Sequence, residues 1–325
     1  MSERSGCPPA PDDLRVVIGD IHGDWEAAWK LLKKTDVVDK LGRKKPHRHV
    51  TFIGDIGHYG HDVYGADYYA LYIAAKFGNA LIGGNHEGAN LFDIPPFGGY
   101  RPPQMVAPEA MRLLNQLKFQ GRWQAAVAID GWLLTHAGLH PAWQEGRLRA
   151  FIKDPVALAE EINRLFYVKL AQHKRDPLFD SVGPIRSRMT KEGFDPSRRD
   201  DDEPGGVFWM DAHEVVGGPW KRPDGSLYYP SLLDFNRIRQ IVGHTGSISG
   251  KANPAPLFYG DSFIINDVGA APSGRACALV KRAQQEKWTP VISVVRRKGG
   301  QAHDISESTD SIRAHHPELE AILGG

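Results

Sequence analysis

Five short stretches of this 325-residue chain place a polar, metal-capable side chain directly after an apolar run, with glycine beside it. They read GDIHGD (19–24), GDIGHYG (54–60), GGNHEG (83–88), LLTHAG (133–138) and IVGHTG (241–246). The carboxyl ends of parallel strands open onto a common crevice, and glycine lets the backbone turn sharply there. We therefore predict that the five stretches converge, which restricts the chain to folds whose strand ends face one another.

The order of elements favours an α/β fold. Strand-like and helix-like segments alternate at 14–20, 24–32, 49–55, 65–77 and 79–85. Crossover helices between parallel strands produce this alternation. Further along, the pattern predicts a helix at 108–119, a hairpin turning at Asp130-Gly131, and a long helix at 155–174. Three later runs, SFIINDVG, ACALVKR and TPVISVVRR, are predicted to be antiparallel neighbours.

We expect one folded domain over residues 14–297, with an insertion at about 140–235. A disordered lead at 1–13 precedes it, and a polar tail at 298–325 follows. The lead is rich in proline and has no apolar core, so it is not expected to be a secretory signal.

Composition excludes several classes of function. The formal net charge is +1, which gives no overall field toward nucleic acids or anionic membranes. No apolar run has the length of a membrane span. Two cysteines cannot build a disulfide framework, so we expect a reducing compartment. The sequence predicts a cytoplasmic protein with no membrane partner and no general nucleic-acid binding.

A shared cation explains the five stretches better than five separate polar groups do. Each buried polar group without a partner costs about 1–3 kcal/mol, whereas one metal site satisfies all of them. The groups concerned are Asp20, His22, Asp55, Asn85, His86, His136 and His244. Imidazole and amide donors suit manganese, iron or zinc better than calcium or magnesium.

The ordered motifs resemble those of the calcineurin-like metallophosphoesterase superfamily. Within that superfamily they resemble the phosphoprotein phosphatases, and most closely the bacterial Shewanella-like branch. RLFYVKL (164–170), THAGLHP and IVGHT add to the resemblance, which spans about residues 14–282. It implies a four-layer α/β/β/α sandwich and a two-metal site, with manganese first and iron or zinc as alternatives. The implied reaction is hydrolysis of a phosphorylated protein or a small phosphoester.

The resemblance also implies a role for each residue. Asp20 and His22 would hold one metal, Asp55 would bridge both, and Asn85, His136 and His244 would complete the second. Two such metals lower the pKa of a bridging water and clamp phosphoryl oxygens. His86 matches the acid that protonates the leaving group, although it could instead only orient water. Glu87 would not bind a metal itself but would hold the surrounding groups in place.

One motif departs from the family pattern, which reads GDxxDRG in protein phosphatases. Here His58 stands where the pattern has aspartate, and Tyr59 where it has arginine. Without that aspartate the pKa of His86 should be lower than in relatives, and without the arginine phosphate is gripped less by charge. A phosphodiesterase or a hydrolase of dinucleoside polyphosphates or cyclic nucleotides therefore remains an alternative. A non-catalytic binding module of the same fold is a third.

Overall fold

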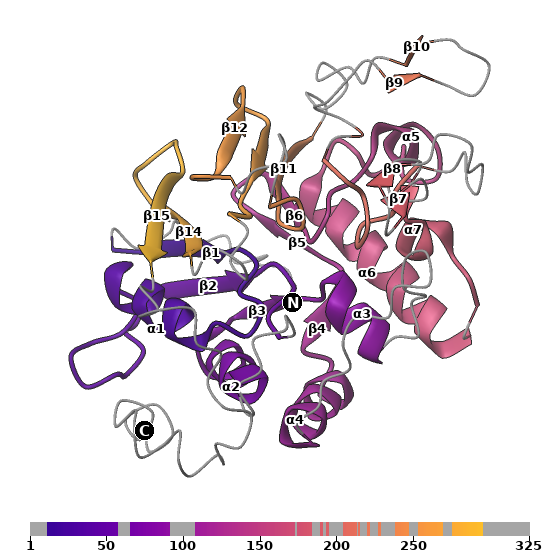
Figure 1. Ribbon diagram of the computed structural model, residues 1–325. Helices are drawn as coiled ribbons and strands as arrows, with labels where there is room; N and C mark the ends of the chain where they lie inside the picture. Colours follow the sequence, from indigo (N-terminus) through magenta and orange to yellow (C-terminus); the bar gives the residue numbers. More distant parts are fainter. Residues whose placement is uncertain are drawn as a thin grey trace.

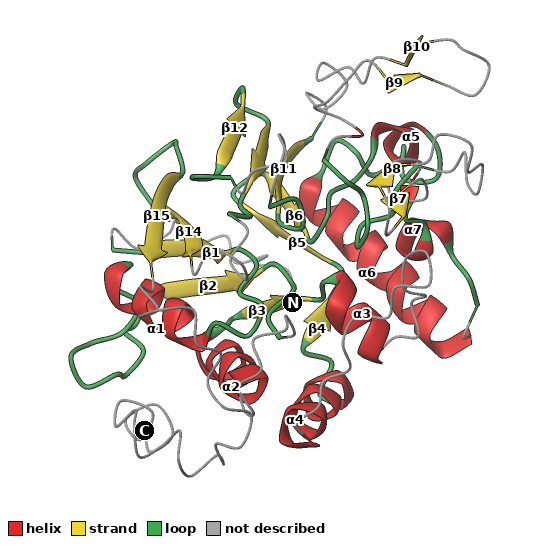
Figure 2. Ribbon diagram, viewed as in Figure 1, coloured by secondary structure: helices red, strands yellow, loops and turns green. Residues whose placement is uncertain are grey.

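Two β-sheets form the centre of the protein, and helices lie on their outer sides (Figure 1, Figure 2). The computed structural model describes residues 12–57, 66–91, 108–172, 174–183, 204–212, 214, 238–246, 253–268 and 275–294. It also describes the backbone of four short strands at 189–190, 193–194, 220–221 and 227–228. Most of the predicted lead and all of the predicted tail lie outside these ranges, so the predicted domain boundaries stay a prediction.

The first sheet contains the predicted βαβ units. In spatial order it consists of β15 (Thr289–Val294), β14 (Arg275–Arg282), β1 (Leu14–Ile18), β2 (Arg48–Phe52), β3 (Ala80–Ile82) and β4 (Trp123–Gln124). Strands β1 to β4 run parallel, while β14 is antiparallel to both β1 and β15. The helices of its outer side are α1 (Trp25–Lys34), α2 (Ala66–Phe77) and α4 (Pro108–Phe119).

The second sheet consists of β12 (Leu257–Tyr259), β13 (Phe263–Ile265), β11 (Arg239–Val242), β6 (Trp132–Thr135) and β5 (Ala126–Ile129). Helix α6 (Pro155–Gln172) packs against β5 and β6. The remaining elements are α3 (Asn85–Leu91), α5 (Pro141–Glu145), α7 (Pro177–Asp180), the pair β7 (Met189–Thr190) and β8 (Gly193–Phe194), and the pair β9 (Trp220–Lys221) and β10 (Leu227–Tyr228). The result is the predicted four-layer α/β/β/α arrangement.

Alternation along the strands explains why the sheets pack in this way. In β1, Val16 and Ile18 belong to the large core on the helix side, whereas Val17 belongs to a second cluster between the sheets. That cluster joins Ile82 of β3 to Ile241 of β11. A strand buried on both faces reads as a continuous apolar run, as Val16, Val17 and Ile18 do after Arg15.

The predicted hairpin is confirmed, and one predicted strand pairing is wrong. Strands β5 and β6 pair through a turn in which Asp130 and Gly131 have φ of 49° and 80°, as a type I′ turn requires. Of the three strands that were predicted to be neighbours, only β14 and β15 pair with each other. Strand β13 instead lies parallel to β11 in the second sheet. Its apolar run carries no signal for its partner, because all three of its residues are buried.

Among the described helices, none has both the length and the apolar character needed to cross a membrane.

A buried histidine, His140, caps the start of helix α5. Its burial predicts that the stability of the protein depends on pH. His140 Nδ1 accepts a hydrogen bond from the Ala142 amide at 3.1 Å, and burial lowers the pKa of His140 to about 4. An unfolded histidine titrates near pH 6.5, so between these values the unfolded state binds more protons. We expect the free energy of unfolding to fall by about 3 kcal/mol from pH 7 to pH 4 because of this residue.

His140→Asn keeps a side chain suited to the first position of a helix and removes the titration. Urea denaturation of both proteins at pH 7 and pH 4 measures the difference. If the two proteins lose the same stability on acidification, His140 does not cause the loss.

Candidate metal centre

The five predicted stretches meet at the carboxyl ends of the parallel strands. Asp20 and His22 follow β1, Asp55 follows β2, and Asn85 with His86 opens α3 just after β3. His136 follows β6 and His244 follows β11, both in the second sheet. The side chains of all seven are 10% exposed or less. The site therefore lies where the two sheets meet, and each sheet contributes residues to it.

One half of the site is built around His136. Its Nε2 atom lies 2.9 Å from Asn85 Oδ1, 3.1 Å from His244 Nδ1 and 3.5 Å from Asp55 Oδ1. The other ring nitrogen, Nδ1, is 2.9 Å from the carbonyl oxygen of Ile53. A carbonyl only accepts, so Nδ1 carries the proton and, in a neutral ring, the lone pair is on Nε2. That lone pair faces two oxygens and another imidazole.

This arrangement fits a cation. Lone pairs that converge within such distances repel one another unless a positive charge lies among them. Suitable ligand atoms of Asp55, His136 and His244 lie within 4.8 Å of one another. The backbone hydrogen bond of His136 fixes its ring orientation, as is usual for metal-binding histidines.

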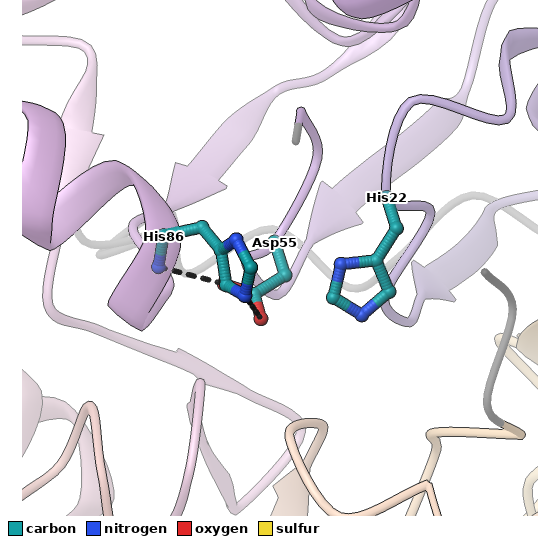
Figure 3. Close-up of side chains that lie close together, drawn as sticks. All are labelled: His22, Asp55 and His86. Atoms are coloured by element: carbon teal, nitrogen blue, oxygen red, sulfur yellow. Dashed lines mark hydrogen bonds and ion pairs between the residues drawn. The ribbon is translucent and has the colours of Figure 1, made fainter. Parts of the chain in front are cut away.

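The second half of the site shares Asp55 with the first. Ligand atoms of His22, Asp55 and His86 also lie within 4.8 Å of one another, and Figure 3 shows the Asp55 side chain between the two imidazoles. His86 Nε2 is 3.7 Å from Asp55 Oδ2, and the two imidazole centroids are 5.3 Å apart. Asp20 Oδ2 lies 3.9 Å from His22 Nε2. The structure thus adds His86 to the group formed by Asp20 and His22.

Asp20 supports the same conclusion about a cation. Its Oδ2 atom accepts a hydrogen bond from the His244 amide at 2.9 Å, which links the two sheets. Its Oδ1 atom is buried, and no hydrogen-bond donor within the described residues reaches it. A buried carboxylate oxygen without a donor is costly unless a cation pairs with it.

The backbone holds three of these residues in an unusual conformation. His22, Asp55 and His244 have φ of 50°, 45° and 66°, in the left-handed region that few non-glycine residues adopt. Such conformations cost about 1–3 kcal/mol each and cluster at functional sites. Packing is equally close, since a Cβ atom on Gly84 would collide with Asp55 Oδ1. The glycines of the motifs therefore allow the crowding that the sequence predicted.

Glu87 lies behind the loop that carries Asp55. Its carboxylate is fully buried and accepts hydrogen bonds from four backbone amides. The donors are Asp55 at 3.0 Å, Ile56 at 2.9 Å, Gly57 at 3.2 Å and Gly84 at 2.9 Å. Burial and the nearby Asp55 charge raise the pKa of Glu87, while the four amide donors favour the ionised carboxylate and oppose that rise. Glu87 thus fixes the loop after β2 to the turn before α3.

The surroundings of Asp55 and Asp20 shift the pKa values of these two carboxylates in opposite directions. Burial alone would raise the pKa of Asp55, but His136, His86 and His22 outweigh it and lower the pKa to about 2. Burial raises the pKa of Asp20 well above its usual value, and neighbouring carboxylates add to the rise. Asp55 is therefore surrounded by imidazoles, and Asp20 by negative charge.

Some contributors to the site were missed by sequence reasoning. The backbone of 204–212, inside the predicted insertion, supports both histidine loops of the second sheet. Val207 O accepts from the Ala137 amide at 2.8 Å, and the Trp209 ring meets His244 edge-on with centroids 6.4 Å apart. The run VFWM within this segment is apolar, but such a run does not reveal which loops it will contact. His58 and Tyr59 lie outside the described residues, so their predicted role stays a prediction.

Asp267 is a second omission. It follows β13, is 3% exposed and acts on the pKa of Asp20. A signal was present in the sequence, since SFIINDVG also places a carboxylate and a glycine after an apolar run. The prediction that β13 pairs with β14 placed it in the wrong sheet.

The chain matches one known protein family in sequence. The model of the calcineurin-like phosphoesterase family matches residues 15–245, which include all five motifs. No curated protein matches the chain significantly in sequence. Among solved structures, a protein serine/threonine phosphatase from Saccharomyces cerevisiae is similar with 14% identity and a TM-score of 0.46, covering 90% of this chain and 82% of that one. A metallophosphoesterase from Sphaerobacter thermophilus has 12% identity and a TM-score of 0.42, covering 96% and 97%.

A structure named as a candidate diadenosine tetraphosphatase has 15% identity and a TM-score of 0.43, covering 87% of this chain and 96% of that one. The family assignment itself rests on the family match, which spans well over half of the sequence and includes the candidate ligands from Asp20 to His244. The chain belongs to the calcineurin-like phosphoesterase family and is a hydrolase of phosphoesters.

Proposed function

We propose that the protein is a phosphomonoesterase of the phosphoprotein phosphatase type that uses two metal ions, manganese first. One observation carries the proposal: the Asp55 carboxylate belongs to both groups of ligand atoms, one with His22 and His86 and one with His136 and His244. A carboxylate has two oxygens and can bridge two cations. A single shared residue between two clusters is what a dinuclear site needs.

The residues divide between two cations as follows. Asp20, His22 and Asp55 would hold one ion, and Asp55, Asn85, His136 and His244 would hold the other. When bound, a pair of divalent ions activates a water for attack and neutralises charge on the phosphoryl oxygens. The chain itself fixes the ligands: Glu87 holds the loop of Asp55, and Ile53 O orients the His136 ring.

His86 is suited to hold a proton for the leaving group. Its Nε2 atom is 3.7 Å from Asp55 Oδ2, which places the ring at the edge of the proposed metal site. The backbone amide of His86 donates to Asp55 Oδ1 at 3.1 Å, which fixes the start of α3 beside the site. In the reaction, a proton at Nε2 would pass to the departing oxygen.

His86→Ala separates the role of an acid from a role in positioning. Nitrophenolate leaves readily without a proton, whereas an alkoxide does not. We expect kcat to fall about 100-fold on an alkyl phosphate such as phosphoserine and less than about tenfold on p-nitrophenyl phosphate. An equal loss of kcat on both substrates would show that His86 is not the acid. The exposed His47→Ala is the control and should change neither rate.

The substrate class is tested with matched esters. Wild-type protein loaded with Mn²⁺ is assayed on p-nitrophenyl phosphate and on bis-p-nitrophenyl phosphate, and then after chelation. We expect faster hydrolysis of the monoester and loss of both activities on chelation. Faster hydrolysis of the diester would contradict the proposal and favour a phosphodiesterase or nucleotide hydrolase. No hydrolysis of either would point to the binding-module alternative.

A further inference from the structure

Asp267 lies beside the metal centre because of the register of β13. This strand runs parallel to β11, with Val242 opposite Ile265. The pairing continues past the strand end, since the Asn266 amide donates to Val242 O at 2.6 Å. Asp267 therefore leaves the second sheet at the same level as His244.

Two asparagines fix the backbone of Asp267 against the metal loops. Asn266 Nδ2 donates to Val17 O at 3.0 Å, and the Asn266 carbonyl lies so near Gly19 that a Cβ there would collide with it. Gly19 directly precedes Asp20. Asn253 Nδ2 donates both to Thr245 O at 2.8 Å and to Asp267 O at 2.9 Å. The main chain of Asp267 is thus held between the loop of Asp20 and the loop of His244.

Asp267 and Asp20 are buried carboxylates on adjoining loops at the strand ends. Both side chains are nearly fully buried, at 3% and 2% exposure. Burial is the main reason that the pKa of Asp20 is raised, and the Asp267 charge is the largest electrostatic contribution, ahead of Asp55. Like charges in a region of low dielectric repel strongly. A cation held by one of them reverses the sign of the interaction, because both carboxylates then attract it.

We propose that Asp267 is a positioning residue whose negative charge strengthens binding of the metal ion held by Asp20 and His22. The inference rests on the proposed dinuclear function and adds a residue to it. Asp267 acts through its electric field on the ion and on Asp20, in the way that groups around metal ligands commonly tune affinity.

The direct test is the isosteric variant Asp267→Asn. The variant and the wild type are titrated with Mn²⁺, and free Mn²⁺ is measured by electron paramagnetic resonance. We expect one of the two equivalents to bind about 10-fold to 100-fold more weakly in the variant, with the other unchanged. Asp261→Asn is the control, because Asp261 is exposed and lies just before the other end of β13. This variant should bind Mn²⁺ as the wild type does. Asp267→Glu keeps the charge and should bind more tightly than Asp267→Asn.

Thermal unfolding of the metal-free proteins distinguishes this role from a structural one. Removing a repulsion should leave metal-free Asp267→Asn with a Tm equal to or above that of the wild type, while the rise in Tm on adding Mn²⁺ shrinks. A lower metal-free Tm with an unchanged rise on adding Mn²⁺ would show that Asp267 only supports the fold.

The two hypotheses fail separately. If the wild type binds two Mn²⁺ and hydrolyses phosphoesters while Asp267→Asn binds both ions with unchanged affinity, the inference about Asp267 is overturned and the function stands. If the wild type binds no Mn²⁺, the dinuclear function falls and the inference falls with it.

Discussion

Replacing Asp55 with asparagine is expected to lower kcat/KM for a phosphomonoester by about three orders of magnitude, which is about 4 kcal/mol of transition-state stabilisation. Asparagine keeps the shape of the side chain but removes the charge and one acceptor oxygen. Both ligand groups contain Asp55, so the change weakens both at once. Bound manganese should also fall by at least one equivalent, measured by elemental analysis after dialysis.

The comparison is with Asp261→Asn, which removes the same charge from an exposed position. That control should keep full activity and full metal content. A variant at Asp55 that retained two equivalents and wild-type turnover would contradict the central role given to this carboxylate.

Glu87→Gln is expected to damage both stability and catalysis without touching a metal ligand. Each carboxylate oxygen of Glu87 accepts two backbone amides. A glutamine would turn one oxygen into an NH₂ group that faces two donors. We expect the free energy of unfolding to fall by about 3 kcal/mol.

The same change should lower activity by about 1000-fold. Loss of the amide contacts frees the loop that carries Asp55, and a displacement of about 1 Å near a reacting group costs about 100-fold. Weaker metal affinity adds about another tenfold. Urea denaturation and assays over a range of Mn²⁺ concentrations measure the two effects.

Glu109→Gln tests whether any glutamate of the chain would respond in the same way. The Glu109 side chain is half-exposed and pairs only with Arg112 across one helical turn among the described contacts, so Glu109→Gln should change stability by less than about 0.5 kcal/mol. If Glu87→Gln were as mild as this control, the carboxylate would not hold the loop.

Strand ends and glycines were the most informative features of the sequence. Asp20, Asp55 and Asn85 each follow an apolar run, and parallel strands bring such ends together whatever the details of packing. The hairpin at Asp130-Gly131 was equally readable, because few residue pairs tolerate its backbone. These features depend on local chemistry, which a sequence displays directly.

Features that depend on the partner of a strand were not readable. Asp267 shares the strand-end pattern, yet three buried residues in β13 do not reveal which sheet they join. The supporting contacts of Val207 and Trp209 come from a short apolar run inside the predicted insertion, which does not reveal its partners. Local patterns report the burial of a strand, whereas its neighbours are chosen by packing across the whole molecule.

The sequence by itself determined the fold class and a group of side chains suited to metal binding, because apolar periodicity and strand-end glycines are local properties of the chain. Only the tertiary structure decided that Glu87 holds the loop of Asp55 through four amides, and that Asp267 lies between the loops of Asp20 and His244. Those relations join residues up to about 250 positions apart, and the physical reason is that long-range register and burial, not neighbours in the chain, fix where a charge finally lies.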